Sequence, residues 1–535
     1  MVTAKTKVLD LSFNHTKFNE SGIEDFYWPV KISETRAYRS HLFNELADFL
    51  QVLRADNKEV SQCIEVLTPK FINLSINMFQ AALLYSKAST DSYTIELGQR
   101  YSLLKYLKTE NYLFEDPYVS CLERGPAPLN RWRLPLRFTR DILMSHCEGI
   151  SRRTLRTVNY KDDVITSTTQ PLVQAWRKRF GSQRVIFKRD NAFFHPLSGV
   201  DESLSDTERE WLGKLALLNE KMFRHFNLSC PAVFTRYITE VLEKSICRIR
   251  THIALLKKRN DLPLNLWSNT GGSPWSRMLA IVVRERGGFV TSFDHAGGHA
   301  YSHICDLDYI NFVEFLTCDR FVTFSKKQAG RLETVCRKDL CKVEFDHVQD
   351  KSVRCSVGSA SNIQSSHAKK ILFFITIYPC ERVGCAADFM SNQTAVDWQI
   401  RLSSFLKELG YDVILKPHPE SPVKMPQYFE KDLGIKISYE SFESAVNEAD
   451  YLLCDYVAST TFRTACMSNK PMILVDFGLK KLSDEAERSL SKRCSILKGY
   501  FDQNNRAMID WEKLVPAIQT SVSKKGKEFI VDYFL

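Results

Sequence analysis

Two short segments in the C-terminal third combine side chains that can bind a phosphate. Residues 416–420 read Lys-Pro-His-Pro-Glu, so Lys416, His418 and Glu420 lie in a loop whose backbone is restricted by two prolines. A lysine beside an imidazole can hold a phosphate, and the carboxylate can accept a ribose hydroxyl or fix the histidine tautomer. A capped turn around a buried histidine explains this segment equally well when it is taken alone.

The second segment is Ser459-Thr460-Thr461, which follows an apolar stretch ending at Asp455 and precedes an expected helix. Hydroxyl groups and free backbone N–H groups meet at such a helix start, where the helix dipole favours an anion. Serine and threonine are also ordinary N-cap residues. Both segments are expected at strand ends of one parallel sheet, where ligands usually bind. A shared phosphate site therefore explains the pair better than two unrelated helix caps.

A second pair of loops lies further upstream. Residues 268–273 read Ser-Asn-Thr-Gly-Gly-Ser and link an expected strand to an expected helix, while residues 294–299 read Asp-His-Ala-Gly-Gly-His after the next strand. Gly271 and Gly272 allow the backbone to approach a ligand closely, and Asp294 stands where a catalytic carboxylate is expected. The alternative is that the glycines serve only the turn and that Asp294 caps a helix.

The elements that position these loops are short apolar stretches alternating with helical stretches, a pattern that predicts parallel sheets covered by helices. The first such region has expected strands at 264–268, 288–293 and 320–325. The second has expected strands at 370–377, 411–416, 451–455 and 471–476. We therefore expect an α/β protein with two Rossmann-like domains facing a cleft, with ligands at the carboxyl ends of the strands.

The pattern also suggests boundaries along the chain. We expect a helix-rich N-terminal portion of the first domain, the Rossmann-like core of that domain, a second Rossmann-like domain, and a helical tail, at residues 1–255, 256–360, 367–500 and 501–535.

Composition narrows the class of protein. The chain of 535 residues is 44% hydrophobic and 25% charged, as in globular proteins, and we expect a cytoplasmic location because neither a signal peptide nor a membrane-spanning stretch is recognisable. The 15 cysteines are scattered, which favours reduced thiols over a zinc site. The net charge of +10 favours anionic partners, including sugar nucleotides, glycolipids and a membrane surface. We expect no nucleic-acid partner, because the basic runs are not part of a known nucleic-acid motif.

The segments at 416–420 and 455–461 resemble the donor domain of GT-B glycosyltransferases. The resemblance is closest to bacterial enzymes that use CMP-activated ulosonic acids, namely the Kdo transferases of capsule and O-antigen synthesis and the sialyltransferases. It implies that His418, Ser459 and Thr460 hold the CMP phosphate and that Glu420 binds the ribose. In this family the C-terminal domain, here residues 367–500, binds the nucleotide sugar, and the N-terminal domain, here residues 1–360, lies on the acceptor side. The residues themselves add the glycines of the loop at 268–273 as donor contacts and Arg277 as a partner for the sugar carboxylate. The full set of expected donor contacts is Lys416, His418, Glu420, Ser459, Thr460, Thr461, Gly271, Gly272, Ser273 and Arg277.

The Asp-His-x-Gly-Gly sequence at 294–298 resembles a loop of the retaining β-Kdo transferases. In those enzymes an aspartate attacks the sugar, which implies that Asp294 is the nucleophile, with His295 and His299 as further catalytic residues. In an inverting reaction Asp294 would instead be the general base, and both outcomes remain open. The expected reaction moves an ulosonic acid, with Kdo favoured, from a CMP donor to a bacterial surface glycan or glycolipid. A peripheral contact of the protein with the inner membrane remains open.

The sequence also bears on the need for a cofactor and leaves two other functions open. No cofactor or metal is required, because His418 and Lys416 can stabilise a departing phosphate, and Asp306-Leu307-Asp308 is discounted as a metal motif. A CDP-alditol-dependent glycerol- or ribitol-phosphate transferase would use the same phosphate turns. A sugar-nucleotide-binding scaffold without catalysis is the remaining alternative.

Overall fold

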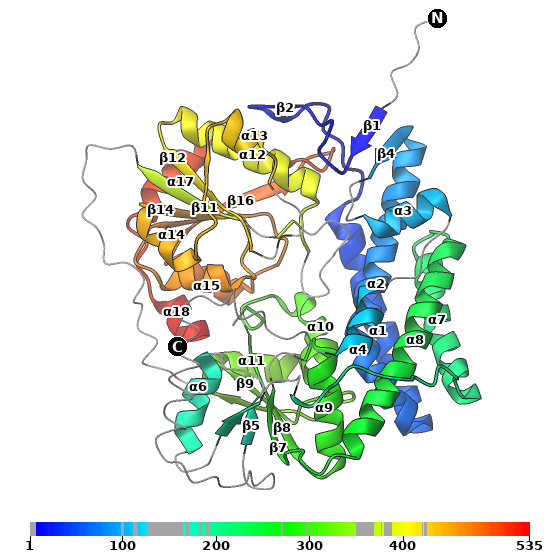
Figure 1. Ribbon diagram of the computed structural model, residues 1–535. Helices are drawn as coiled ribbons and strands as arrows, with labels where there is room; N and C mark the ends of the chain where they lie inside the picture. Colours follow the sequence, from blue (N-terminus) through cyan, green and yellow to red (C-terminus); the bar gives the residue numbers. More distant parts are fainter. Residues whose placement is uncertain are drawn as a thin grey trace, which may run out of the picture.

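The computed structural model describes residues 7–97, 101–110, 116–125, 164–166, 171–180, 185–188, 192–268, 271–295, 298–348, 369–375, 377–378, 388–419, 421 and 425–535. Within these ranges the chain builds two large parallel sheets and a group of long helices beside them (Figure 1). The predicted α/β class with two Rossmann-like units is confirmed by their topology.

The first unit is a sheet in the order β10-β9-β8-β7-β5-β6, with every described strand pair parallel. Its strands are β5 (Val164–Thr166), β6 (Val185–Phe187), β7 (Asn265–Ser268), β8 (Phe289–Phe293), β9 (Arg320–Thr323) and β10 (Glu344–His347). Its helices include α6 (Pro171–Arg177), α9 (Pro274–Glu285) and α11 (Lys326–Val335). Strands β5 and β6 lie in the portion expected to be helix-rich. The sequence does not predict them, because three-residue strands that contain Val-Ile are too short to show a period.

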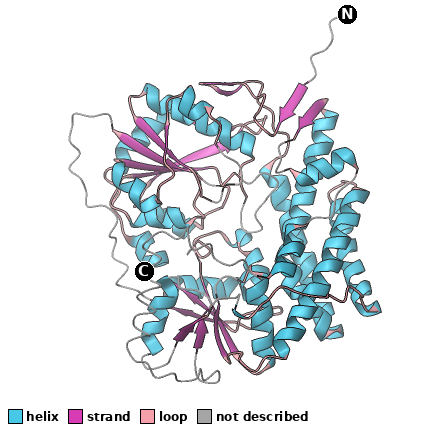
Figure 2. Ribbon diagram, in the orientation of Figure 1, coloured by secondary structure: helices cyan, strands magenta, loops and turns pink. Residues whose placement is uncertain are grey.

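The second unit is a sheet in the order β13-β12-β11-β14-β15-β16-β17, parallel except for the last pair. Its strands are β11 (Lys370–Phe374), β12 (Asp412–Lys416), β13 (Lys436–Ile437), β14 (Tyr451–Cys454), β15 (Met472–Asp476), β16 (Ser495–Phe501) and β17 (Ala507–Ile509). Its helices are α12 (Asn392–Glu408), α13 (Tyr428–Lys431), α14 (Phe442–Glu448), α15 (Thr460–Met467), α16 (Asp484–Leu490) and α17 (Leu514–Ser521). Figure 2 shows helices on both faces of this sheet.

Local sequence explains these elements. The central strands β11 and β14 are almost entirely apolar and buried, as parallel strands covered on both faces must be. Helices α12, α14, α15 and α16 each begin after a serine whose side chain accepts a backbone N–H of the first turn.

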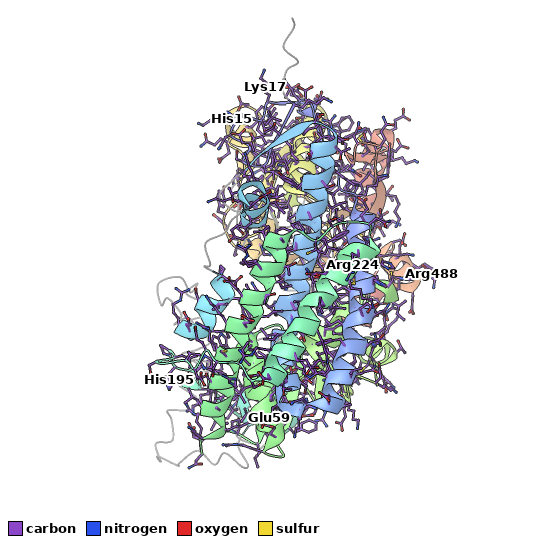
Figure 3. All side chains as sticks on the ribbon, turned by 90° about the vertical axis from the view of Figure 1, so that its right-hand side faces the viewer. His15, Lys17, Glu59, His195, Arg224 and Arg488 are labelled. Atoms are coloured by element: carbon purple, nitrogen blue, oxygen red, sulfur yellow. The ribbon has the colours of Figure 1, made fainter. Side chains whose placement is uncertain are left out.

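The long helices of the N-terminal half are α1 (Ile32–Asp56), α2 (Lys58–Thr90), α7 (Asp206–His225) and α8 (Ala232–Lys257). They lie side by side along one flank of the molecule (Figure 3), and α1 and α2 extend from the first unit to the second (Figure 1). A single apolar cluster contains their buried faces, one face of the first sheet, and Phe374, Phe462 and Phe534 of the second half. The two units are therefore joined by continuous packing.

Helix α18 (Glu528–Phe534) closes the arrangement by returning to the first unit. Ser325 Oγ donates to the Asp532 carbonyl at 2.5 Å, and Gln328 Nε2 donates to the Tyr533 carbonyl at 2.5 Å. The Lys327 ammonium lies 2.7 Å from the Asp532 carboxylate. The end of the second half is thus held on helix α11.

Candidate functional site

The two predicted phosphate-binding turns lie on either side of one strand. Phe374 of β11 is paired with Lys416 of β12 on one side and with Cys454 of β14 on the other. Because neighbouring strands are about 4.8 Å apart, the two turns start about 10 Å from each other. From β11 the chain continues to β12 at one side and later to β14 at the other. This is the topological switch point at which open α/β sheets bind ligands.

On the β12 side, the Lys416 side chain is buried and its Nζ donates to the Pro417 carbonyl at 3.3 Å. Burial lowers the pKa of Lys416, and the Glu443 carboxylate opposes this. The neighbouring His418 is half-buried, and its carbonyl accepts the Ser421 N–H at 3.1 Å. Glu420 lies outside the described residues.

On the β14 side, the start of α15 is capped by Ser459. Its Oγ accepts the Phe462 N–H at 3.0 Å and lies 2.8 Å from Thr461 Oγ1. Thr460, the first residue of the helix, is exposed. Ser459 is therefore an N-cap, which is one of the two interpretations of this segment. The other backbone N–H groups at the start of α15 have no partner within the helix, so the cap does not exclude an anion there.

The loop after β8 carries Asp294 to the same place. From Asp294 the chain crosses to the second unit, where Tyr301 Oη donates to the Val457 carbonyl at 2.6 Å in a fully buried hydrogen bond. A Cβ added at Gly298 would lie 3.9 Å from the Ala458 Cα. Residues 457 and 458 immediately precede Ser459, so Asp294 and the phosphate turn of α15 belong to one junction.

The Asp294 side chain is fully buried and lies beside a histidine. Asp294 Oδ1 and His299 Nε2 are 3.8 Å apart, and His299 Nδ1 lies 2.5 Å from the Tyr309 hydroxyl. Burial lowers the pKa of His299 to about 4, with Asp294 opposing the shift and Lys480 adding to it. His299 is thus neutral near pH 7. His295, the other predicted catalytic histidine, is exposed.

Two cations near Asp294 are absent from the sequence-based prediction. The first is Lys480, which is 3% exposed and follows strand β15. Its Nζ lies 5.7 Å from the centre of the Tyr309 ring. Burial lowers the pKa of Lys480 to about 8, while the carboxylates of Asp306 and Asp294 oppose the shift. Lys480 comes from a loop with no motif, so only the fold could reveal it.

The second cation is Arg463, on the first turn of α15. Its guanidinium lies 3.8 Å from the centre of the Phe324 ring and 5.6 Å from that of Phe534. Its Nε is buried and has no hydrogen-bond partner among the residues that the structure describes. Burial lowers the pKa of Arg463, and Asp294 opposes this. Its position two residues after the Ser-Thr-Thr segment is a signal that could have identified it.

The loop after β7 is packed against residues 312–314 of the same unit. The Gly271 N–H donates to Glu314 Oε2 at 2.8 Å, and a Cβ at Gly271 would lie 2.2 Å from the Val313 carbonyl oxygen. Arg277 is fully buried and its Nη1 donates to the carbonyls of Gly271, Phe312 and Val313 at 2.8, 3.0 and 3.1 Å. Burial lowers the pKa of Arg277 to about 10. The guanidinium thus holds this loop. Gly272 is exposed and Ser273 half-buried, directly before α9.

The discounted Asp-x-Asp sequence is divided between two environments. Asp306 is buried, and its Oδ2 accepts the Lys481 N–H at 2.8 Å, while Asp308 is half-buried. In the described part of the chain, no three His, Cys, Asp or Glu side chains come together in a way that suits a metal ion. No helix in that part is long and apolar enough to cross a bilayer.

Comparison with known proteins gives a likeness in structure but none in sequence. No protein-family profile matches the sequence, and no curated protein matches it. Among solved structures, the chain is similar to a UDP-N-acetylglucosamine 2-epimerase from Rickettsia bellii, with 12% sequence identity and a TM-score of 0.32 over 69% of this chain and 88% of that one.

Proposed function

We propose that the protein is a glycosyltransferase that uses a sugar nucleotide, and more narrowly one that moves an ulosonic acid such as Kdo from CMP to a surface glycan or glycolipid. The observation that carries the proposal is that Asp294 and the phosphate turn at the start of α15 belong to one junction, while the Lys416 turn begins on the other side of strand β11. The 3.9 Å approach of the Gly298 position to Ala458 supports it. Lys416 and His418 on one side, and the start of α15 on the other, would hold the CMP phosphate.

Arg463 is the group that we assign to the sugar carboxylate. It replaces Arg277, whose guanidinium is held by main-chain carbonyls. The Arg463 guanidinium lies between the Phe324 and Phe534 rings, 3.8 and 5.6 Å from their centres, and its buried Nε has no hydrogen-bond partner among the described residues. A planar guanidinium held in this way suits a carboxylate, which it can bind through two hydrogen bonds.

The proposed reaction has two steps. A carboxylate oxygen of Asp294 forms a bond to the anomeric carbon while the bond from that carbon to the phosphate oxygen breaks, and CMP leaves with the electron pair. The acceptor hydroxyl then attacks the same carbon, and the Asp294 oxygen leaves. With its proton on Nδ1 and directed at Tyr309, neutral His299 presents Nε2 to take the proton of the acceptor.

The test uses a panel of donors. The purified chain is incubated separately with CMP-Kdo, CMP-sialate and CDP-glycerol, with release of CMP as the measurement. We expect release from a CMP-ulosonic acid and, without acceptor, a covalent sugar adduct seen by intact-protein mass spectrometry. Release from CDP-glycerol alone would favour the alditol-phosphate transferase, and CMP binding without turnover would favour a scaffold.

A further inference from the structure

A pocket of about 490 Å³ lies between the start of the helical portion and the second unit. Its walls come from residues 28–36, from Gln80 of α2, and from three loops of the second unit at residues 388–391, 477–478 and 501–505. The volume lies within the range of about 300–1,000 Å³ that is usual for small-molecule sites. None of the residues expected to bind the donor lines it.

The pocket is held open by hydrogen bonds between its walls. Arg36 donates to Asp388 at 2.8 Å and to the Gly478 carbonyl at 2.7 Å. On the opposite wall, Asn505 Nδ2 donates to the Trp28 carbonyl at 2.7 Å. Because segments far apart in the sequence are joined in this way, the cavity exists without a ligand, and a ligand would bind it without ordering the walls first.

The chemistry of the walls fits a neutral polar ligand. The charged side chains in the lining are Lys31, Arg36, Asp388 and Asp502, two of each sign, so their formal charges cancel. Arg36 and Asp388 also neutralise each other directly. A nucleotide or another strongly anionic ligand would find no excess of positive charge here, unlike at Lys416 and Arg463.

Four aromatic side chains are among the residues that line the pocket, namely Trp28, Phe389, Phe477 and Phe501. Among them, Phe389 and Phe501 are only half-buried. Gln80 Oε1 is buried and has no hydrogen-bond partner within the described residues. Flat apolar rings beside an unpaired amide acceptor match a saccharide, which has C–H faces and hydroxyl edges.

The pocket shares structural elements with the Asp294 junction. Asp388 in its wall also accepts from Arg39 Nη1 at 2.9 Å, and Arg39 Nη2 lies 3.5 Å from Asp306. Gly478 lines the pocket, and Lys480 stands two residues further along the same loop at the junction. A saccharide in this pocket would therefore lie next to the junction that holds Asp294.

We propose that this pocket binds the saccharide portion of the acceptor, an inference that rests on the proposed transferase function. The loop at 477–480 would then link the acceptor pocket, which Phe477 and Gly478 line, to Lys480 near Asp294. A remote pocket of this kind holds the acceptor so that its hydroxyl is presented to the anomeric carbon, which raises the effective concentration of the nucleophile.

The test compares two neighbouring aromatic residues of β16. Phe501 lines the pocket, whereas Tyr500 does not line it and is 55% exposed. The full chain and the variants Phe501→Leu, Gln80→Leu and Tyr500→Leu are applied to an array of immobilised bacterial capsule and lipopolysaccharide-core oligosaccharides, and CMP binding is measured by calorimetry. We expect the wild type and Tyr500→Leu to bind the same oligosaccharide, with affinity lowered about tenfold or more in the other two variants.

CMP binding should be the same in all four proteins. The proposal is overturned if the wild type binds no oligosaccharide on the array, or if both pocket variants bind as the wild type does. Oligosaccharide binding that depends on Phe501, in a chain that binds no CMP and releases none from any donor, would leave the saccharide pocket standing and remove the transferase function.

Discussion

Two glycine-containing loops follow the neighbouring strands β7 and β8, and they serve different purposes. In the loop after β7, the Gly271 N–H and the Arg277 guanidinium are bound to Glu314 and to main-chain carbonyls. In the loop after β8, Asp294 and His299 lie near the cations Lys480 and Arg463, and Tyr301 of the same segment is hydrogen-bonded to the second unit. Similar sequences at adjacent strand ends can thus support packing in one case and chemistry in the other, and the hydrogen-bond partners separate the two.

The largest expected effect is the loss of turnover in Asp294→Asn. An amide cannot form the covalent adduct, so we expect CMP release from the donor to fall about 10³-fold or more. The measurement is CMP release together with intact mass, and calorimetry with CMP shows whether the donor site remains.

The matched control is Asp308→Asn, which changes the half-buried acidic residue of the discounted Asp-x-Asp sequence. We expect its turnover to stay within about threefold of the wild type, because only Asp294 reaches the reacting carbon in the proposed mechanism. A loss of activity in Asp308→Asn that added Mg²⁺ restores would contradict the assignment and revive the metal hypothesis.

The next effect concerns stability in the packing loop. A Cβ in Gly271→Ala would lie 2.2 Å from the Val313 carbonyl oxygen, so the two segments must separate, and we expect the free energy of unfolding to fall by about 3 kcal/mol. Chemical denaturation measures this. Gly330→Ala is the control, because a Cβ on that helical glycine meets nothing within 4 Å and should stabilise the protein slightly. Equal stability of the two variants would show that this loop is not packed as described.

His299, in the loop after β8, should make the stability of the protein depend on pH. The pKa of His299 is lowered by burial to about 4 from the ordinary 6.5. Between pH 4 and 6.5 the unfolded chain therefore binds more protons than the folded chain, so the stability falls as the pH drops through this window, by about 3 kcal/mol.

Urea denaturation at a series of pH values between 4 and 7 tests this expectation. The variant His299→Gln should lose that part of the acid dependence, whereas His295→Gln, which changes the exposed histidine of the same loop, should keep it. Identical pH profiles for the wild type and His299→Gln would mean that the imidazole is not held neutral beside Asp294.

The smallest expected effect is a loss of affinity for the sugar part of the donor in Arg463→Gln. Arg463→Gln removes the proposed partner of the sugar carboxylate, so we expect the KM for CMP-Kdo to rise about tenfold while CMP itself binds as before. Arg488→Gln is the control, because Arg488 is exposed on α16 (Figure 3). An equal loss of affinity for CMP and for CMP-Kdo in Arg463→Gln would place this arginine on the phosphate instead.

The sequence was sufficient to predict the strand ends that carry Lys416, Ser459 and Asp294, because apolar parallel strands and serine N-caps are local signals. It could not predict that Arg277 would be buried, since the carbonyls that surround its guanidinium come from residues 312 and 313 of another element.

Contacts between the two units were equally beyond prediction. Lys480 and Tyr301 carry no motif, and their importance comes from a junction between segments more than a hundred residues apart in sequence. The short strands β5 and β6 were missed because three residues show neither alternation nor length.

Helix α18 has a consequence for how the protein is made. The Phe534 ring centre lies 5.6 Å from the Arg463 guanidinium, and the carbonyls of Asp532 and Tyr533 accept hydrogen bonds from side chains of the first unit. Units of a nascent chain usually fold in the order of their synthesis. Here the contacts of α11 with α18 can form only after residue 534 has been synthesised, so we expect this part of the first unit to be completed late in folding.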